Sequence, residues 1–236
     1  MKFRILAEGS TRWQRLIKHW GLSILIDEDI LFDTFGKADY VLRQLGRSGD
    51  DIGKIKHVIL SHDDWDHVGG LWRILERNHD MTVYICPHFS PAVKEKIRSH
   101  GARLIEVKGI TNIRDNIYSS GELTGRRGES DIPEQYLAIK TDKGVVLLTG
   151  CAHPGIVEIV QHAEANFELD VSLLIGGFHL KDHMENDAHN IILKLKSLGV
   201  GRVVPFHCTG AVAQRLFKKE FKEDCIIPGE GRLIRI

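Results

Sequence analysis

The chain has 236 residues, and its 32 lysine and arginine residues are balanced by 32 aspartate and glutamate residues. A chain of this length fits one α/β domain and can bury roughly 70% of its unfolded surface. Because the formal net charge is zero, no basic field favours nucleic acid or an anionic membrane. The longest apolar stretches have the length of a strand, far short of the roughly 20 residues of a membrane helix. We expect a soluble protein with a small-molecule substrate, no nucleic-acid partner and no membrane partner; oligomeric state is left open.

Cysteine usage points to a reducing compartment. The four cysteines are scattered without CxxC spacing, which argues against a zinc knuckle or a dithiol redox motif. The apolar patch at the start of the chain is too short for the core of a signal peptide. The sequence therefore predicts a cytoplasmic protein.

The first part of the chain reads as strands interrupted by helices. Residues 2–7 alternate as a strand, and residues 22–34 read as a tight hairpin. A helix is expected over residues 37–45, ending near Gly46, followed by a short buried strand at residues 56–60. Further elements are expected as a helix over 71–77, a strand over 81–85, a helix over 91–99 closed by Gly101, and a strand over 102–107.

The second part of the chain shows the same kinds of element. Residues 108–128 are polar and glycine-rich, which fits small strands and a mobile loop. A hairpin is expected from residues 136–141 and 145–150, because Asp-Lys-Gly makes a suitable turn between them. The remaining elements are expected as a helix over 154–165, a strand over 171–176, a helix over 187–198 and a strand over 202–206. Two mixed sheets packed face to face, with helices outside, are the predicted architecture.

Histidines follow several of the predicted strands. His62, His153, His179 and His207 each come directly after an apolar run. Loops at the carboxyl ends of strands are where α/β enzymes place their chemistry. This placement predicts an active site built from loops that are far apart in the sequence.

The densest group of candidate ligands is the segment SHDDWDHVGG, residues 61–70. Imidazole nitrogen and carboxylate oxygen suit zinc, manganese or iron. Alternate positions along an extended loop can direct His62 and Asp64 at one ion, and Asp66 and His67 at a second ion about 3.5 to 4 Å away. Glycines at the end of the segment are expected to let the backbone turn into the next helix. The alternative is a loop of solvated charges in which His67 caps that helix.

These residues resemble a known family. The segment is similar to the HxHxDH signature of the metallo-β-lactamase superfamily, here as HxDxDH. The motifs FDT, SHDDWDHVGGL, TGCAHPGI, GGFHL and PFHCTG, in that order, resemble its dihydropterin-methyl-(ribofuranosyl)aminobenzene phosphate synthase-like branch. The resemblance implies a single domain over residues 1–236 with the α/β metallo-β-lactamase fold, an αββα four-layer sandwich.

The resemblance also implies a ligand set for one or two ions. His62, Asp64 and His153 would bind one ion, and Asp66, His67 and His207 the other. Asp64 stands where the superfamily usually has histidine, which shifts preference toward harder ions. Zinc is the expected metal, with manganese or iron as alternatives. Cys151 occupies the slot in which many members have a bridging aspartate, so a single filled site is an alternative to a dinuclear one.

Three further positions have candidate roles beside these ligands. Asp66 is expected to orient or deprotonate the nucleophile. His179 is expected to contact substrate or transfer a proton, with metal binding and a structural role as alternatives. Asp33 either accepts a ring N–H from a ligand histidine or is a turn residue at a strand end. Cys208 and Thr209, which follow His207, are candidates for supporting it.

The resemblance leaves three functions open. The first is a metal-dependent hydrolase in which metal-bound hydroxide attacks an ester, lactone or phosphoester of a small molecule. The second is the transfer named by the branch, which joins a dihydropterin-methyl diphosphate to an aminobenzene ribofuranosyl phosphate with loss of pyrophosphate. Arg12, Arg126 or Arg127 would then hold a phosphate. The third is a non-catalytic metal-binding or ligand-binding protein, which the cysteine in the bridging slot motivates.

Overall fold

The computed structural model describes residues 1–17 and 19–236, and the side chain of Arg12 lies outside this description. The chain divides into two compact units. Unit 1 comprises Met1–Lys108 with Gly229–Ile236, and unit 2 comprises Gly109–Pro228. The expectation of a single domain over residues 1–236 remains a prediction.

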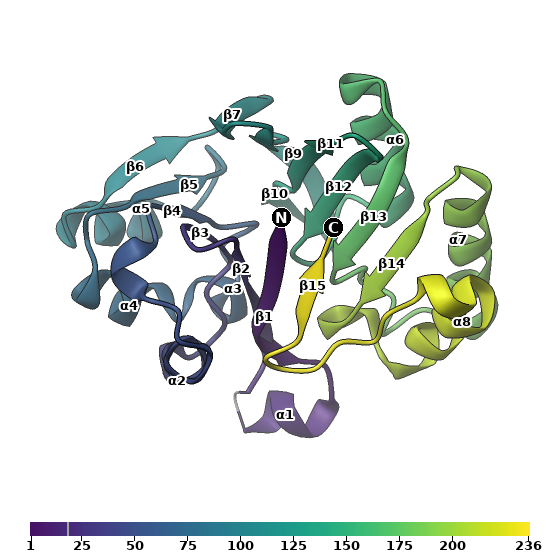
Figure 1. The fold of residues 1–236 in the computed structure, drawn as a ribbon, viewed down its shortest axis with the longest axis horizontal. Coiled ribbons are helices and arrows are strands. Elements are labelled where there is room, and N and C mark those ends of the chain that lie inside the picture. The colour runs from purple at the N-terminus through teal and green to yellow at the C-terminus, as the bar shows by residue number, and fades with distance from the viewer. Residues whose placement is uncertain (18) are drawn as a thin grey trace. The chain divides into compact units, whose positions relative to one another are not determined.

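Unit 1 is a seven-stranded mixed sheet with helices (Figure 1). The strand order is β15-β1-β2-β3-β4-β5-β6; β15 to β3 pair antiparallel, and β3 to β6 pair parallel. Its strands are β1 (Lys2–Gly9), β2 (Gly21–Ile26), β3 (Ile30–Phe32), β4 (His57–Ile59), β5 (Thr82–Ile85), β6 (Arg103–Glu106) and β15 (Leu233–Arg235). Its helices are α1 (Arg12–Leu16), α2 (Ala38–Ser48), α3 (Trp65–Val68), α4 (Leu71–Arg77), α5 (Pro91–Ser99) and the 3₁₀ helix η1 (Ile52–Lys54).

The core of unit 1 forms where the apolar faces of α2 and α4 meet the sheet. Val41 and Leu45 of α2 and Ile74 of α4 are buried in one cluster with strand residues such as Leu31 and Val83. Burial of apolar area is the main favourable term in folding, so this contact fixes the helices against the strands. The loops that leave β3 and β4 are thereby held at one edge of the sheet.

Most of the predicted elements of unit 1 are confirmed, and two expectations are wrong. Helix α2 does not end near Gly46 but continues to Ser48. The left-handed residue that closes it is Gly49, with φ 73°, where the missing Cβ removes the steric cost. The metal-ligand segment is not extended throughout, because residues 65–68 form the helical turn α3.

Unit 2 is a six-stranded mixed sheet with helices and a separate hairpin (Figure 1). The strand order is β14-β13-β12-β11-β8-β7; β12, β13 and β14 are parallel, and β9 pairs with β10 alone. Its strands are β7 (Thr111–Arg114), β8 (Ile117–Ser119), β9 (Leu123–Arg127), β10 (Ser130–Glu134), β11 (Leu137–Thr141), β12 (Gly144–Thr149), β13 (Val171–Gly176) and β14 (Arg202–Pro205). Its helices are α6 (Ile156–Phe167), α7 (Glu185–Ser197), α8 (Ala211–Phe221) and the 3₁₀ helices η2 (His207–Thr209) and η3 (Lys222–Asp224).

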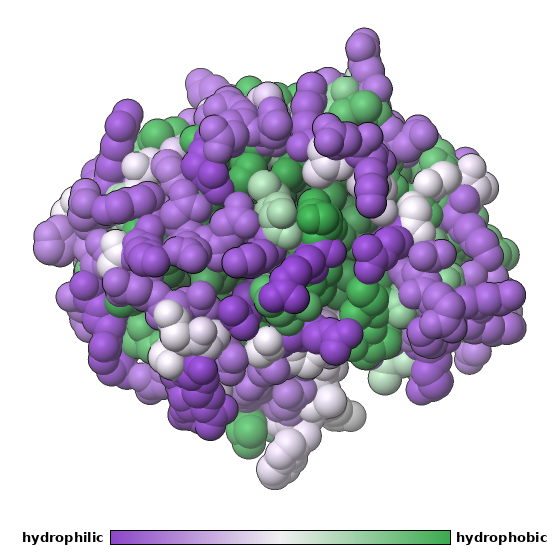
Figure 2. All heavy atoms as spheres, in the orientation of Figure 1, coloured by the Kyte–Doolittle hydropathy of each residue, from purple (hydrophilic) through white to green (hydrophobic). Residues whose placement is uncertain are grey.

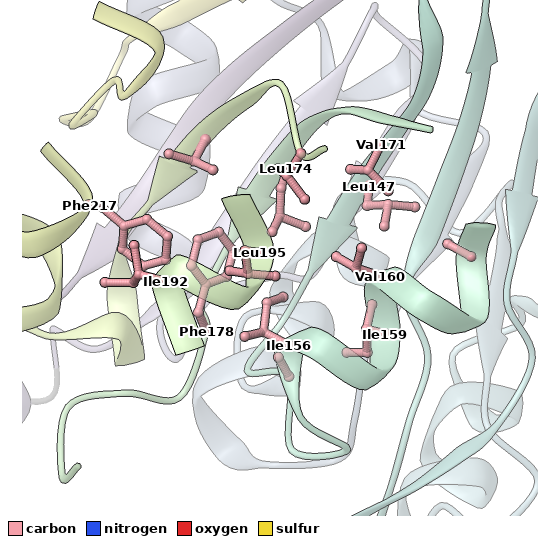
Figure 3. Close-up of a cluster of buried hydrophobic side chains, with 14 of the residues drawn as sticks. Leu147, Ile156, Ile159, Val160, Val171, Leu174, Phe178, Ile192, Leu195 and Phe217 are labelled. Carbon is pink, nitrogen blue, oxygen red and sulfur yellow. The ribbon is translucent and has the colours of Figure 1, made fainter. Parts of the chain in front are cut away.

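The core of unit 2 is packed between its helices and the parallel strands. Figure 3 shows Ile159 and Val160 of α6 directed toward Leu147, Val171 and Leu174 of the sheet. The rings of Phe178 and Phe217 meet edge to face with centroids 5.3 Å apart, an arrangement that aromatic pairs favour. The three parallel strands are therefore anchored, and their carboxyl ends share one edge.

The ends of the described chain meet within unit 1. Strand β15 pairs antiparallel with β1, and the amino group of Met1 donates to the carbonyl oxygen of Ile236 at 3.4 Å. Hydrophilic side chains cover much of the face shown in Figure 2, with apolar side chains between them. Among residues 1–17 and 19–236, no helix is both long and apolar enough to cross a membrane.

Candidate functional site

The candidate ligands of unit 1 form one compact cluster after β4. His62 and His67 are fully buried, and their ring centroids lie 4.0 Å apart. The Nε2 atom of His62 lies 3.7 Å from a carboxylate oxygen of Asp64, and the Nε2 atom of His67 lies 3.4 Å from one of Asp66. Each of the two imidazoles therefore has a carboxylate beside its Nε2 atom, and imidazole nitrogen and carboxylate oxygen are donors that suit a divalent ion.

Asp33 fixes both imidazoles of this cluster. Its carboxylate is fully buried and accepts hydrogen bonds from His67 Nδ1 at 2.7 Å and from the Ser61 hydroxyl at 2.7 Å. Since the Ser61 hydroxyl donates to Asp33, it accepts from His62 Nδ1, which lies 2.8 Å away. Both rings thus carry a proton on Nδ1, so Nε2 is the ring nitrogen that could bind an ion, as in ligand histidines whose tautomer a neighbour fixes.

The charges around His67 favour its protonated form when no ion is bound. Burial alone would lower the pKa of this imidazole, but the carboxylates of Asp33 and Asp66 outweigh burial and raise the pKa well above its usual range. A divalent cation in the same place would replace the second proton in balancing these carboxylates.

Close backbone packing holds the helical turn α3 in place. Gly21 of β2 has φ 118°, and a Cβ there would lie 1.9 Å from the carbonyl oxygen of Asp66. A Cβ on Gly70 would lie 2.0 Å from the carbonyl oxygen of Thr34. Gly69 and Gly70 have ordinary right-handed helical angles, so these two glycines are required by close approach and not by turn freedom. That corrects the role expected from the sequence.

The candidate ligands of unit 2 lie at the carboxyl ends of three adjacent parallel strands. Cys151 and His153 follow β12, His179 follows β13, and His207 follows β14. Three residues here have left-handed backbone angles without being glycine: Ala152 at φ 61°, His179 at φ 51° and His207 at φ 53°. Such strain persists only where surrounding structure enforces it, and it concentrates at functional sites.

Glu134, at the end of β10, positions the loop after β12. One of its carboxylate oxygens accepts the backbone N–H groups of Cys151 and Ala152, at 2.9 and 2.8 Å. The other accepts the backbone N–H and the Nδ1 of His153, both at 2.8 Å. Burial disfavours the ionised carboxyl, but these hydrogen bonds and the charge of His153 lower the pKa of Glu134 to about 2. His153 therefore also presents Nε2.

The hairpin that carries Glu134 packs directly on His153. A Cβ on Gly125 of β9 would lie 2.5 Å from the Cβ of His153, so only glycine lets the strand approach this closely. The backbone N–H of Arg126 donates to the carbonyl oxygen of His153 at 3.2 Å. The isolated β9–β10 hairpin thus holds this histidine through its ring and through its backbone.

The remaining candidates of unit 2 form a group of thiols and imidazoles. Cys151 Sγ lies 3.4 Å from His207 Nε2, and both residues are buried. The Cys208 thiol lies 3.6 Å from the carbonyl oxygen of Cys151. Burial opposes ionisation of Cys208, but the hydrogen bond from Cys151 and the charges of His207 and His179 bring its pKa well below the usual value. A hydrogen bond to Cys208 in turn raises the pKa of His179.

A pocket of about 650 Å³ opens in unit 2 beside this group. His153 and His179 line it together with apolar side chains such as Phe178 and Ile191. Arg126 and Lys194 also line it, and they supply positive charge. A concave, largely apolar site with a few polar groups is the usual form of a small-molecule site.

The structure brings the predicted ligands together within each unit. His62, Asp64, Asp66 and His67 cluster in unit 1 with Asp33, and Cys151 and His207 are neighbours in unit 2. His179 lies nearest to His153 and Cys208, with a distance of 4.5 Å between the ring centroids of the two histidines. Which of these residues bind an ion, and which act in catalysis, remain predictions.

Sequence reasoning missed two residues. Ser61 was part of the motif, but its link between Asp33 and His62 depends on a contact made across the sheet. Glu134 carries no local signal, because nothing in its own segment shows that it reaches residues 151–153.

Comparison with known proteins shows to which family the chain belongs. A model of the metallo-beta-lactamase superfamily matches residues 21–207. The chain belongs to this superfamily, and the predicted metallo-β-lactamase fold is confirmed. The similarity to a crystal structure of Tm1679, a metal-dependent hydrolase of the β-lactamase superfamily, has a TM-score of 0.81 at 25% identity and covers 100% of this chain and 99% of the other.

The chain is also similar to two further known proteins. The chain is 29% identical to 7,8-dihydropterin-6-methyl-4-(beta-D-ribofuranosyl)-aminobenzene-5'-phosphate synthase of Methanocaldococcus jannaschii, over 91% of this chain and 89% of the relative. Its fold is also similar to that of the short form of human tRNase Z, with a TM-score of 0.65 at 15% identity over 100% and 99% of the two chains. The second similarity concerns the fold alone.

Proposed function

We propose that this chain is a metal-dependent hydrolase that acts on a small-molecule ester, lactone or phosphoester. The observation that carries the proposal is the uniform presentation of three imidazoles. His62, His67 and His153 each have Nδ1 hydrogen-bonded to a buried oxygen, so that Nε2 is the ring nitrogen that would bind an ion. Histidines that bind a metal through one ring nitrogen almost always donate the other N–H to such a partner.

In this proposal the ligand set is the one that the family pattern implies. His62, Asp64 and His153 would hold one ion, and Asp66, His67 and His207 would hold the other, with Cys151 as a further candidate ligand. Ions held there would act as Lewis acids and supply a hydroxide nucleophile near neutral pH. Zinc suits the imidazole and thiolate donors, and manganese or iron suits the carboxylates. A reducing cytoplasm suits the four free cysteines.

The chain's own residues would direct the chemistry. Asp33 and Glu134 hold the ligand imidazoles in one tautomer, so no reorganisation is needed when the substrate reacts. The carboxylate of Asp66 would accept a proton from the attacking group. His179 lines the pocket beside His153 and would donate a proton to a leaving group.

Turnover of chromogenic substrates tests the proposal. The full chain, stripped with a chelator and reloaded with zinc or manganese, is assayed on a p-nitrophenyl ester, a lactone and a p-nitrophenyl phosphodiester. We expect metal-dependent hydrolysis of at least one of them, lost in His153→Ala and retained in the control His162→Ala. Turnover that survives removal of the metal would contradict the proposal.

Group transfer is the second candidate, because a specific observation favours it. Arg126 and Lys194 line the same pocket as His153, so an anionic substrate group would be bound near the ligand cluster. The similarity to the Methanocaldococcus synthase extends over most of both chains. The reaction would join a dihydropterin-methyl diphosphate to a ribofuranosylaminobenzene phosphate. Arg127 is exposed on the same hairpin, and the side chain of Arg12 lies outside the described structure.

Pyrophosphate release separates the two candidates. With both pterin and aminobenzene substrates present, transfer requires pyrophosphate and the joined product in equal amounts. Hydrolysis of the chromogenic substrates without any such product would support the hydrolase. Metal binding without either activity would instead support a non-catalytic binding protein.

A further inference from the structure

Unit 2 contains a second group of three possible metal ligands, two of which lie outside the ligand set that the family pattern implies. Cys151, His179 and Cys208 follow β12, β13 and β14, three neighbouring parallel strands. Their donor atoms all lie within 4.8 Å of one another. Both thiols are buried, and neither forms a disulfide.

The surrounding backbone keeps space for these donors. A Cβ on Gly177 would lie 2.6 Å from Cys208 Sγ and 2.4 Å from the carbonyl oxygen of Gly150, so only glycine leaves room for the thiol. His179 is held at φ 51°, a strained angle for a residue with a Cβ. Its Nδ1 atom is buried and has no hydrogen-bond partner among the residues that the structure describes. Such an atom gains a partner when an ion binds.

We propose that Cys151, His179 and Cys208 form a binding site for a thiophilic ion such as Zn²⁺, and that unit 2 assembles this site without ligands from unit 1. Two thiolates and one imidazole are a donor set of soft character, with the fourth tetrahedral position open. Zinc bonds of about 2.3 Å to sulfur and about 2.0–2.1 Å to nitrogen require the donors to approach one another only slightly.

This site goes beyond the proposed function and does not depend on it. Its ligands include neither His62 nor His67, and two of its three members lie outside the ligand set of the hydrolase. Cys151 belongs to both sets. An ion held by Cys208 and His179 therefore competes with His207 for the same thiolate, which lies 3.4 Å from His207 Nε2.

Cobalt spectroscopy tests the proposal without any measurement of activity. The full chain carries His62→Ala and His67→Ala, which remove the imidazole ligands of unit 1, and is reduced, stripped of metal and titrated with Co²⁺. We expect one Co²⁺ per chain with near-ultraviolet thiolate charge-transfer absorption. Adding Cys208→Ser should weaken binding by at least about tenfold, because loss of a mere supporting partner of a metal ligand already costs about 10–100-fold.

The test includes a control variant and a replacement for a variant that does not fold. Cys225→Ser removes another buried thiol of unit 2 and should leave the titration unchanged. If Cys208→Ser does not fold, His179→Ala at a partly exposed position replaces it and should weaken Co²⁺ binding to a similar extent. The proposal is overturned if charge-transfer absorption is absent, or if Cys208→Ser and His179→Ala bind Co²⁺ as Cys225→Ser does. Loss of hydrolysis with this absorption intact would refute only the proposed function.

Discussion

Replacing Glu134 by glutamine should loosen the loop that carries Cys151 and His153. The carboxylate accepts four hydrogen bonds, from three backbone N–H groups and from His153 Nδ1. A glutamine has the same size, but its NH₂ group can only donate. If the NH₂ group faces Cys151 and Ala152, both of their backbone N–H groups lose their acceptor. If it faces His153, the backbone N–H of that residue loses its acceptor, and Nδ1 can accept only after a change of tautomer. The variant should therefore leave one or two buried N–H groups without an acceptor.

The expected loss of stability follows from these contacts. Hydrogen bonds to a charged group contribute about 1.5–3 kcal/mol each, so losing one or two should cost about 1.5–6 kcal/mol. The depressed carboxyl pKa gives a similar magnitude: the shift from 4.5 to about 2 corresponds to about 3 kcal/mol. Both values are a substantial fraction of the roughly 5–15 kcal/mol that stabilise a typical domain.

Urea unfolding of the chelator-treated chain measures this loss. Circular dichroism follows the whole chain, and tryptophan fluorescence follows unit 1, because all four tryptophans lie there. We expect Glu134→Gln to lower the unfolding free energy seen by circular dichroism, while Glu129→Gln, an exposed position on the same hairpin, has no effect. A loss below about 1 kcal/mol, the contribution of an ordinary hydrogen bond, would refute the reasoning.

Three more predictions concern the residues around the ligands. Asp33→Asn should lower metal affinity about 10–100-fold in a chelator competition, because it removes the acceptor that orients His67, and unchanged affinity would contradict this role. Gly177→Ala should lower the free energy of unfolding in urea by about 1–3 kcal/mol, because its Cβ would overpack against Gly150 and Cys208. The control Gly46→Ala lies in open space within α2 and should raise this free energy by about 0.5–1 kcal/mol. Equal effects of the two substitutions would argue against the close contact at Gly177. The pKa of Glu134 is lower in the folded chain than in the unfolded chain, so the stabilisation by its carboxylate is present above about pH 4.5 and is lost as pH falls through about 2. Below about pH 4.5 the unfolding free energy should therefore fall less steeply with pH in Glu134→Gln than in the unchanged protein. Parallel curves for the two proteins would count against this role of Glu134.

The sequence predicted those parts of the fold that depend on local pattern. Helix α4 is found over the predicted residues, and α5 begins at Pro91 as expected, because proline suits the first turn of a helix. The C-terminal helix α8 was not predicted, although Ala213, Phe217 and Phe221 repeat at a spacing of four and are buried on one face. This signal was present in the sequence and was overlooked.

Other features could not be read from local pattern. Strand β15 has only three residues and exists through its pairing with β1, at the other end of the chain. The motif around His62 predicted a ligand cluster, but the tautomer of that ring depends on Ser61 and Asp33, which meet only after folding. Glu134 acts across 17 to 19 residues of chain, a contact that no spacing rule predicts.

Metal retention measures the central claim most directly. Zinc bound per chain is determined by elemental analysis after desalting, in a Cys208→Ser background that removes the separate thiol site. The same analysis is made with His62→Ala or His153→Ala added, one from each unit. The account predicts that zinc is retained in the background protein and falls in both variants. Equal zinc in all three proteins would contradict the claim that these imidazoles hold a metal.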